Sequence, residues 1–202
     1  MTSHDTSRST PDLARLEAFE DLAAHQRAIR RFTSEDVPND LVERILAIGT
    51  RAPSARNAQP WRFIVVRDRE TKAKLGAIFD ELGEQMYGAG APDHTPWEDV
   101  PLLIVVTSEY AFGTTEAGVA ALGASIYPCV QNILLAAGAA GLGTVLTTRW
   151  RSREGDIRPL LGLPDSMAVH AIIPTGWPDR RYGRNRRIPV SELTWHERYH
   201  TT

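Results

Sequence analysis

The decapeptide Ala52-Pro53-Ser54-Ala55-Arg56-Asn57-Ala58-Gln59-Pro60-Trp61 runs straight into a β-branched segment, Arg62 to Arg67, that we predict to be a strand. Its proline, serine and asparagine residues are typical of a turn. The amide of Asn57 offers both a donor and an acceptor, a combination that suits the edge of a heterocycle. An ordinary turn with Trp61 filling the core explains the same residues equally well, so the segment alone leaves both interpretations open.

Arginine clusters lie on both sides of this turn in the sequence. Upstream, Gln26–Phe32 contains Arg27, Arg30 and Arg31 at the end of a predicted helix. Downstream, Arg180–Arg187 contains five arginines. Guanidinium groups pair well with phosphate oxygens, so either cluster could clamp an anion, and a solvated basic turn is the alternative for each. A formal net charge of −2 does not support nucleic acid as the partner.

A short glycine motif, Gly141-Leu142-Gly143-Thr144, does not predict a dinucleotide-binding fold. That fold needs G-x-G-x-x-G after a strand and before a helix, whereas these glycines follow a predicted helix and position 146 is Leu. The default interpretation is the C-terminal cap of the preceding helix.

Hydrophobic spacing over the rest of the chain predicts one α+β domain. Apolar stripes mark the first two helices, at Leu13, Leu16, Phe19 and Ala23 and at Leu41, Ile45 and Ile48. The predicted elements are helices over 12–26, from Asn39, and over 75–86, 117–140 and 152–161, with strands over 62–67, 102–107 and 144–148. A last strand, over 167–173, has an alternating pattern.

The segment Ala117–Thr148 lacks charged side chains and raises the question of a membrane span. It contains Pro128, polar residues and several glycines, and its apolar positions are largely alanine, whereas a span needs about 20 strongly apolar residues. We therefore predict a helix buried in protein and bent near Pro128. The single cysteine, Cys129, has apolar neighbours and is predicted to be buried and inert.

Length and composition predict a flexible tail over residues 1–11 and a single domain over 12–202. The first residues contain no apolar leader, and one cysteine fits a reducing compartment, so we expect a cytoplasmic protein. His196 and His200 have helical spacing but no visible third ligand, so no metal site is predicted.

Taken together, the segments R-x-x-R-R-F, P-S-x-x-N-x-Q-P-W, G-L-G-T and the basic stretch ending in Arg187-Ile188-Pro189 resemble the FMN-dependent NAD(P)H nitroreductase family. The resemblance runs from about Ala24 to Leu193. It implies an α+β fold with a central, mainly antiparallel sheet flanked by helices, in an intertwined homodimer with the flavin at the subunit interface.

The resemblance also implies which residues contact FMN. The first motif would place phosphate and ribityl contacts on Arg27, Ala28 and Arg30, although this chain has Gln26 and Ala28 where many members have Arg and Ser. Ser54 and Asn57 would lie near the flavin ring, and Leu146, Thr147 and Thr148 would form the strand beside it. Arg187, with Arg186, would form the second phosphate clamp.

The implied activity is hydride transfer from NAD(P)H to an electron-poor small molecule, a nitroaromatic or quinone, by a ping-pong mechanism. No protein acid or base is assigned, because the flavin carries the chemistry and no His or carboxylate adjoins the four motifs. No adenosine-site motif selects between NADH and NADPH. The alternatives are a flavin-dependent dehalogenase, a flavin-fragmenting relative, and a non-catalytic flavin-binding module.

The Gly88–Pro101 segment is rich in glycine and proline and is predicted to be a loop. Long loops between regular elements often carry binding function, so we expect this one, with Tyr87 and Trp97, to border the substrate mouth. A plain surface loop is the alternative.

Overall fold

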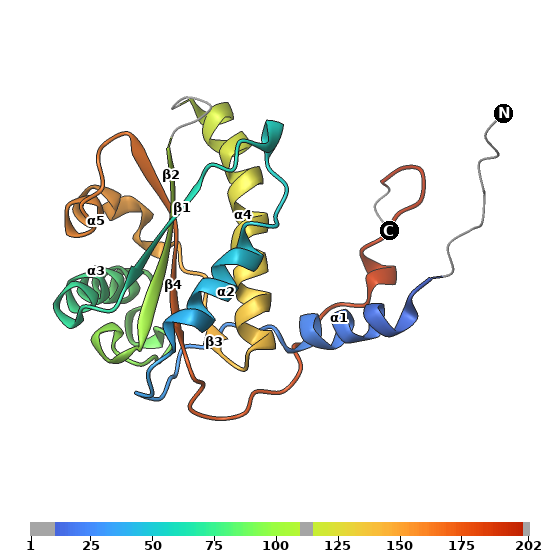
Figure 1. Ribbon diagram of the computed structural model, residues 1–202, viewed down its shortest axis with the longest axis horizontal. Coiled ribbons are helices and arrows are strands. Elements are labelled where there is room, and N and C mark those ends of the chain that lie inside the picture. Colours follow the sequence, from blue (N-terminus) through green and yellow to red (C-terminus); the bar gives the residue numbers. More distant parts are fainter. Residues whose placement is uncertain (1–10, 110–114, 200–202) are drawn as a thin grey trace.

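The computed structural model describes residues 11–109 and 115–199 (Figure 1). The predicted tail therefore lies, apart from Pro11, outside the described residues, as does His200. The helices are α1 (Leu13–His25), α2 (Asn39–Gly49), α3 (Arg69–Tyr87), α4 (Glu116–Ala139) and α5 (Glu154–Leu160), and the strands are β1 (Trp61–Val66), β2 (Leu102–Glu109), β3 (Gly143–Thr144) and β4 (Met167–Gly176).

The four strands form one sheet in the order β1-β2-β4-β3, and every neighbouring pair is antiparallel. This confirms the predicted α+β class and mainly antiparallel sheet. Strands β2 and β4 lie at the centre, and both are buried along almost their whole length. The alternating exposure expected for 167–173 is therefore wrong, because helices cover both faces of β4.

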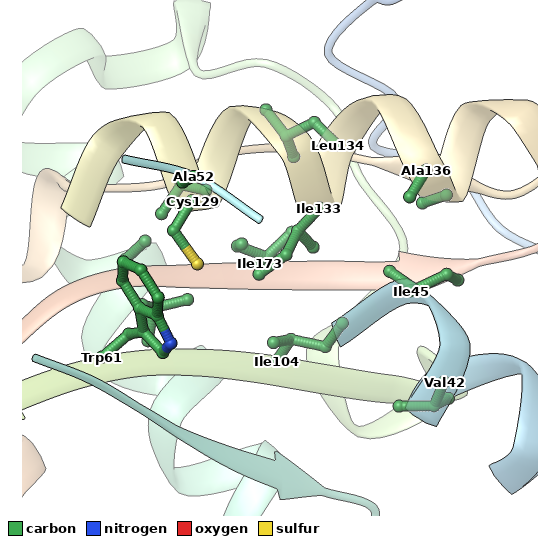
Figure 2. Close-up of a cluster of buried hydrophobic side chains, with 14 of the residues drawn as sticks. Val42, Ile45, Ala52, Trp61, Ile104, Cys129, Ile133, Leu134, Ala136 and Ile173 are labelled. Carbon is green, nitrogen blue, oxygen red and sulfur yellow. The ribbon is translucent and has the colours of Figure 1, made fainter. Parts of the chain in front are cut away.

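Helices α2 and α4 cover one face of the sheet, and α3 and α5 cover the other (Figure 1). Successive residues of a strand point to opposite faces, so Ile104 and Ile173 join the core beneath α2 and α4, while Leu103 and Ile172 join the core beneath α3 and α5. Figure 2 shows the first core, in which Cys129 points toward the sheet. Burial raises the pKa of the Cys129 thiol to about 12, which confirms the prediction of a buried, inert cysteine.

Helix α4 continues through Pro128 without interruption, so the expected bend does not divide it. By length and composition its Ala120–Ala139 segment could span a membrane, but 56% of the apolar window is buried within the fold. Gly141, with φ +83°, ends the helix, and Leu142 N donates to Ala137 O at 2.9 Å while Gly141 N donates to Gly138 O at 3.0 Å. These are the two hydrogen bonds of a Schellman cap, so the predicted helix end is confirmed.

Two expectations for the second half of the chain need correction. Of the predicted strand 144–148, only Thr144 lies in a strand, the two-residue β3, and Thr147 makes an isolated bridge to Ile172. The predicted helix 152–161 begins with a 3₁₀ turn, and regular α-helix starts at Glu154. The loop 88–101 is confirmed and contains two short 3₁₀ turns.

Helix α1 and the C-terminal segment extend away from the sheet and its covering helices (Figure 1). The predicted helix is confirmed, but its apolar stripe is uncovered, with Leu13 60% exposed and Phe19 55% exposed. Further large apolar side chains are exposed along the C-terminal segment at Ile188, Val190, Leu193, Trp195 and Tyr199.

A polar pair lies inside the sheet. His170 on β4 is 5% exposed, and its Nε2 lies 2.8 Å from the hydroxyl of Ser108 on β2. Burial lowers the pKa of His170 from 6.5 to about 4; Arg151 lowers it further, and Glu154 opposes this. The imidazole is therefore neutral in the folded protein near pH 7.

We expect this histidine to make stability depend on pH. Its folded pKa lies below the unfolded value, so its contribution is complete above pH 6.5 and is lost as the pH falls toward about 4. The full loss amounts to about 3 kcal/mol. Urea unfolding should show a steeper fall in the free energy of unfolding over this window for the natural protein than for His170→Gln, which keeps a hydrogen-bonding side chain without a titrating ring. Equal pH slopes in the two proteins would contradict the assignment.

Candidate functional site

The turn that precedes β1 is held in an uncommon backbone conformation. Arg56, Asn57 and Gln59 all have positive φ, at 56°, 55° and 48°. The Ser54 hydroxyl accepts a hydrogen bond from Gln59 N at 3.0 Å, and Ala55 N donates to Ser125 Oγ on α4 at 3.2 Å. Left-handed non-glycine residues concentrate at functional sites, where the surrounding structure enforces them. The turn is thus built to present Asn57, whose side chain is exposed.

The first arginine motif crosses the sheet edge beside β3. Ile29 N donates to Thr144 O at 2.9 Å, and Ala28 pairs with Thr144 in a parallel bridge. A Cβ at Gly143 would lie 2.6 Å from Cγ2 of Ile29, so only glycine permits this approach. The glycine motif therefore serves both the cap of α4 and the docking of the arginine segment.

The second arginine cluster is fastened to the first through Asn185. Asn185 N donates to Ala24 O at 2.7 Å, and its side-chain amide donates to Ala23 O at 3.0 Å and Gln26 O at 3.1 Å. Arg27 Nη1 donates to Gly183 O at 3.3 Å. Segments far apart in the sequence consequently meet at one place on the surface.

The two clusters together line one cavity, formed by Gln26, Arg27, Ala28, Arg184, Asn185, Arg186 and Arg187. None of these residues is acidic. Arg184 pairs with Asp21 at 3.1 Å, whereas no carboxylate of the described chain lies within ion-pair distance of Arg27, Arg186 or Arg187. Unneutralised guanidinium groups around a concavity are suited to hold a phosphate.

Arg30 lies apart from this cavity, in a second and smaller one. Its neighbours there include Thr147, Thr95, His94 and Phe79. The Thr147 hydroxyl donates to Ile172 O at 2.6 Å, so it is committed to the sheet, while Leu146 and Thr148 on either side are exposed. The alternation exposes Leu146 and Thr148, whereas Val145 and Thr147 line the small cavity together with Arg30.

Trp97 does not stand at an open mouth, and this part of the expectation is corrected. Its side chain is 2% exposed and stacks on Phe79 with ring centroids 4.6 Å apart. The ring fills the core beneath α3 because Gly76 leaves space for it. Tyr87, at the end of α3, is 51% exposed.

Sequence reasoning missed two residues of this region. His94 lines the smaller cavity; its Nε2 lies 2.8 Å from Asp80 Oδ1 and its Nδ1 lies 2.9 Å from Thr95 O. Arg149 places its guanidinium carbon 3.8 Å from the centre of the Phe79 ring. Neither carried a sequence signal, because the loop and α3 approach the arginine motif only in the folded chain. No group of three or more potential metal ligands occurs among the residues described.

The asparagine turn and the arginine cavity lie far apart within one chain. The turn contacts α4 at Ser125, whereas Gln26 shares a cavity with Leu134 and Gly138 near the other end of that helix. At 1.5 Å per residue, Ser125 and Gly138 are separated by roughly 20 Å along the helix. The predicted contacts of a single flavin are therefore split between two positions along α4, near Ser125 and near Gly138.

Proteins similar to this chain indicate which family combines such an arginine cavity with such an asparagine turn. The sequence profile of the Nitroreductase family matches residues 23–177. A Methanothermobacter thermautotrophicus protein provisionally named an NADH dehydrogenase/NAD(P)H nitroreductase is 31% identical over 166 residues, which cover 78% of this chain and 76% of that protein. The chain belongs to the nitroreductase family.

Other members of the nitroreductase family that resemble the chain are named for a different reaction. An iodotyrosine deiodinase from Thermotoga neapolitana is 29% identical over 184 residues, covering 83% of this chain and 94% of that protein. The crystal structure of an iodotyrosine deiodinase bound to FMN and 3-iodo-L-tyrosine superposes with a TM-score of 0.67 at 26% identity, covering 91% of this chain and 99% of that one. The family thus includes more than one activity.

Proposed function

We propose that this nitroreductase-family chain is an FMN-dependent oxidoreductase that transfers hydride from NAD(P)H to electron-poor acceptors of the nitroaromatic or quinone class. FMN as cofactor and NAD(P)H as co-substrate are confirmed at the level of the family. The acceptor class and the ping-pong order are our inference. The observation that carries the proposal is the acid-free cavity in which Arg27, Arg186 and Arg187 meet. We also propose that residues 12–202 form a single flavin-binding domain of a cytoplasmic protein.

The residues present fit both the phosphate end and the ring end of FMN. The arginine cavity offers donors to a phosphate, which carries nearly two negative charges and needs pairing wherever it is shielded from water. The segment Ala28–Arg30 leads from this cavity to the sheet edge, where Arg30 and Thr147 share a second cavity and the exposed Leu146 and Thr148 adjoin Thr147. Bound FMN supplies the hydride chemistry, and the protein supplies position and charge.

We propose a homodimer in which Ser54 and Asn57 of the partner subunit complete each flavin site. The separation of roughly 20 Å along α4 keeps the chain's own turn from its own arginine cavity. The uncovered apolar faces of α1 and the C-terminal segment offer a surface for a second copy. The exposed alanines of α4, such as Ala120 and Ala124, permit close packing against it.

A second candidate function is reductive dehalogenation of an aromatic substrate. It is favoured by the similarity to proteins named iodotyrosine deiodinase, at 29% identity over 83% of this chain. Steady-state turnover with a nitroaromatic, a quinone and 3-iodo-L-tyrosine as alternative acceptors separates the two activities. An absence of NAD(P)H oxidation with every acceptor would favour a flavin-binding module.

The first prediction concerns the phosphate clamp. Arg27→Gln and Arg187→Gln should each weaken FMN binding about ten- to a hundredfold, because a charge-assisted hydrogen bond contributes about 1.5–3 kcal/mol. Titration of the flavin-free protein with FMN and with riboflavin measures this, and riboflavin, which lacks the phosphate, should be affected little. Arg180→Gln, outside the cavity, serves as the control. An equal loss for both flavins would reject the clamp.

The second prediction concerns the shared site. In a mixed dimer of Arg27→Gln/Arg187→Gln subunits and Asn57→Ala subunits, one flavin site receives both defects and the other receives none. Mixed dimers purified with two different tags should therefore regain about half of the natural activity, while each parent homodimer stays impaired. Activity that never exceeds the mean of the two parents would place all of these residues on one chain's flavin, and a mass near 22.4 kDa in light scattering would exclude the dimer.

The third prediction concerns the order of substrates. We expect one face of the flavin to serve both substrates in turn, because the flavin accepts the hydride from NAD(P)H before the acceptor takes it. Initial rates measured at several fixed acceptor concentrations should give parallel double-reciprocal lines against NAD(P)H. Intersecting lines would indicate a ternary complex instead.

A further inference from the structure

Aromatic rings hold the guanidinium group of Arg149 in place, but no carboxylate of the described residues forms an ion pair with it. Its guanidinium carbon lies 3.8 Å from the centre of the Phe79 ring and 5.5 Å from the centre of the Tyr87 ring. Such cation–π contacts fix the position of a guanidinium group while leaving its N–H donors available. Tyr87 is half exposed, so this cationic and aromatic surface reaches the outside of the protein.

The neighbouring arginines are neutralised, and Arg149 is not. Arg153 pairs with Glu81 and Asp156, and Arg158 pairs with Glu154. For Arg149, no carboxylate within the described part of the chain lies at ion-pair distance. Burial lowers the pKa of its guanidinium, Tyr87 and Asp80 oppose this shift, and Arg30 adds to it. A partly buried guanidinium without an ion-pair partner is costly, and an anion bound to it would offset that cost.

Two neighbouring segments fix the position of the Arg149 side chain. The residue directly follows Thr147 and Thr148, of which Thr147 lines the cavity beside Arg30 at the sheet edge. On the opposite side, α3 carries Gly83, and a Cβ at that position would overlap Nη1 of Arg149. A glycine in the interior of α3 weakens the helix by about 1 kcal/mol relative to alanine. Here it makes room for the guanidinium.

We propose that Arg149 is a specificity-determining residue that selects aromatic acceptors bearing a carboxylate, with the carboxylate on its guanidinium and the aromatic ring beside Tyr87. The inference rests on the proposed function, because it places the selection at the acceptor side of the flavin site. A planar guanidinium accepts a carboxylate through two parallel hydrogen bonds, and it distinguishes the acid from its ester by charge.

Kinetics with a matched pair of acceptors test the proposal. The natural FMN-loaded enzyme should reduce 4-nitrobenzoate with a kcat/KM at least about tenfold above that for methyl 4-nitrobenzoate, and Arg149→Gln should lose about ten- to a hundredfold for the acid with little change for the ester. The loss should appear mainly in KM. Gly83→Ala should reproduce it, because the new methyl group displaces the guanidinium without removing its charge. Arg44→Gln, an exposed arginine on α2, removes the same charge elsewhere and should change neither substrate.

Binding measured without turnover separates this proposal from the proposed function. Isothermal titration should show benzoate binding to the natural protein more tightly than neutral benzamide, and Arg149→Gln should abolish the difference. Unchanged acid-to-ester ratios in Arg149→Gln and Gly83→Ala would overturn the assignment even if quinone reduction is normal. An effect confined to the KM for NADPH or NADH would also overturn it, by assigning Arg149 to a nucleotide phosphate. Preferential benzoate binding would support the proposal even in a protein that oxidises no NAD(P)H.

Discussion

The antiparallel pairing of β2 with β4 is the constraint on which the remaining structure depends. Both strands are buried on both faces, so their backbone groups can be satisfied only by one another and by the outer strands. Their side chains divide between two cores, and each core fixes a pair of helices. Every segment of the candidate site is attached to this pair: β3 and Thr147 bond to β4, and the turn before β1 leads into the strand beside β2.

The chemistry of the site follows from where the fold leaves positive charge unneutralised. Several arginines elsewhere have carboxylate partners, as Arg153 has in Glu81 and Arg67 has in Asp36. Around the cavity of Arg27, Arg186 and Arg187 the lining contains no acid, and Arg149 is held by aromatic rings instead. A ligand that binds only the folded state stabilises it, so an anion in these positions offsets the repulsion that the arginines create. We propose that the same arrangement makes the site selective for negatively charged groups.

The separation of the asparagine turn from the arginine cavity is also a consequence of the helix between them. Helix α4 is rigid and spans the length of the sheet, and it holds Ser125 near the turn and Gly138 near Gln26. No local rearrangement can bring its two ends together. A second copy of the chain is the simplest means of joining them, and the apolar faces that α1 and the C-terminal segment leave uncovered are consistent with such a copy.

The sequence by itself determined the class of the fold, the order of its helices and strands, and the family, because periodicity and short motifs are local properties. The cap of α4 at Gly141 followed from neighbouring residues alone. Helix lengths did not, because α3 begins at Arg69, before the predicted 75–86. The sequence could not show that β4 is covered on both faces or that only Thr144 of 144–148 lies in a strand, since both depend on which elements pack nearby.

Only the tertiary structure decided which candidate residues meet. It brought Arg27 to Arg187, assigned Trp97 to the core instead of the substrate mouth, and added His94 and Arg149, which no motif marks. The physical reason is that a cavity, an unneutralised charge or a close approach such as that of Gly143 to Ile29 is a relation between segments distant along the chain. Such relations come into being only when the packed sheet fixes the distances between them.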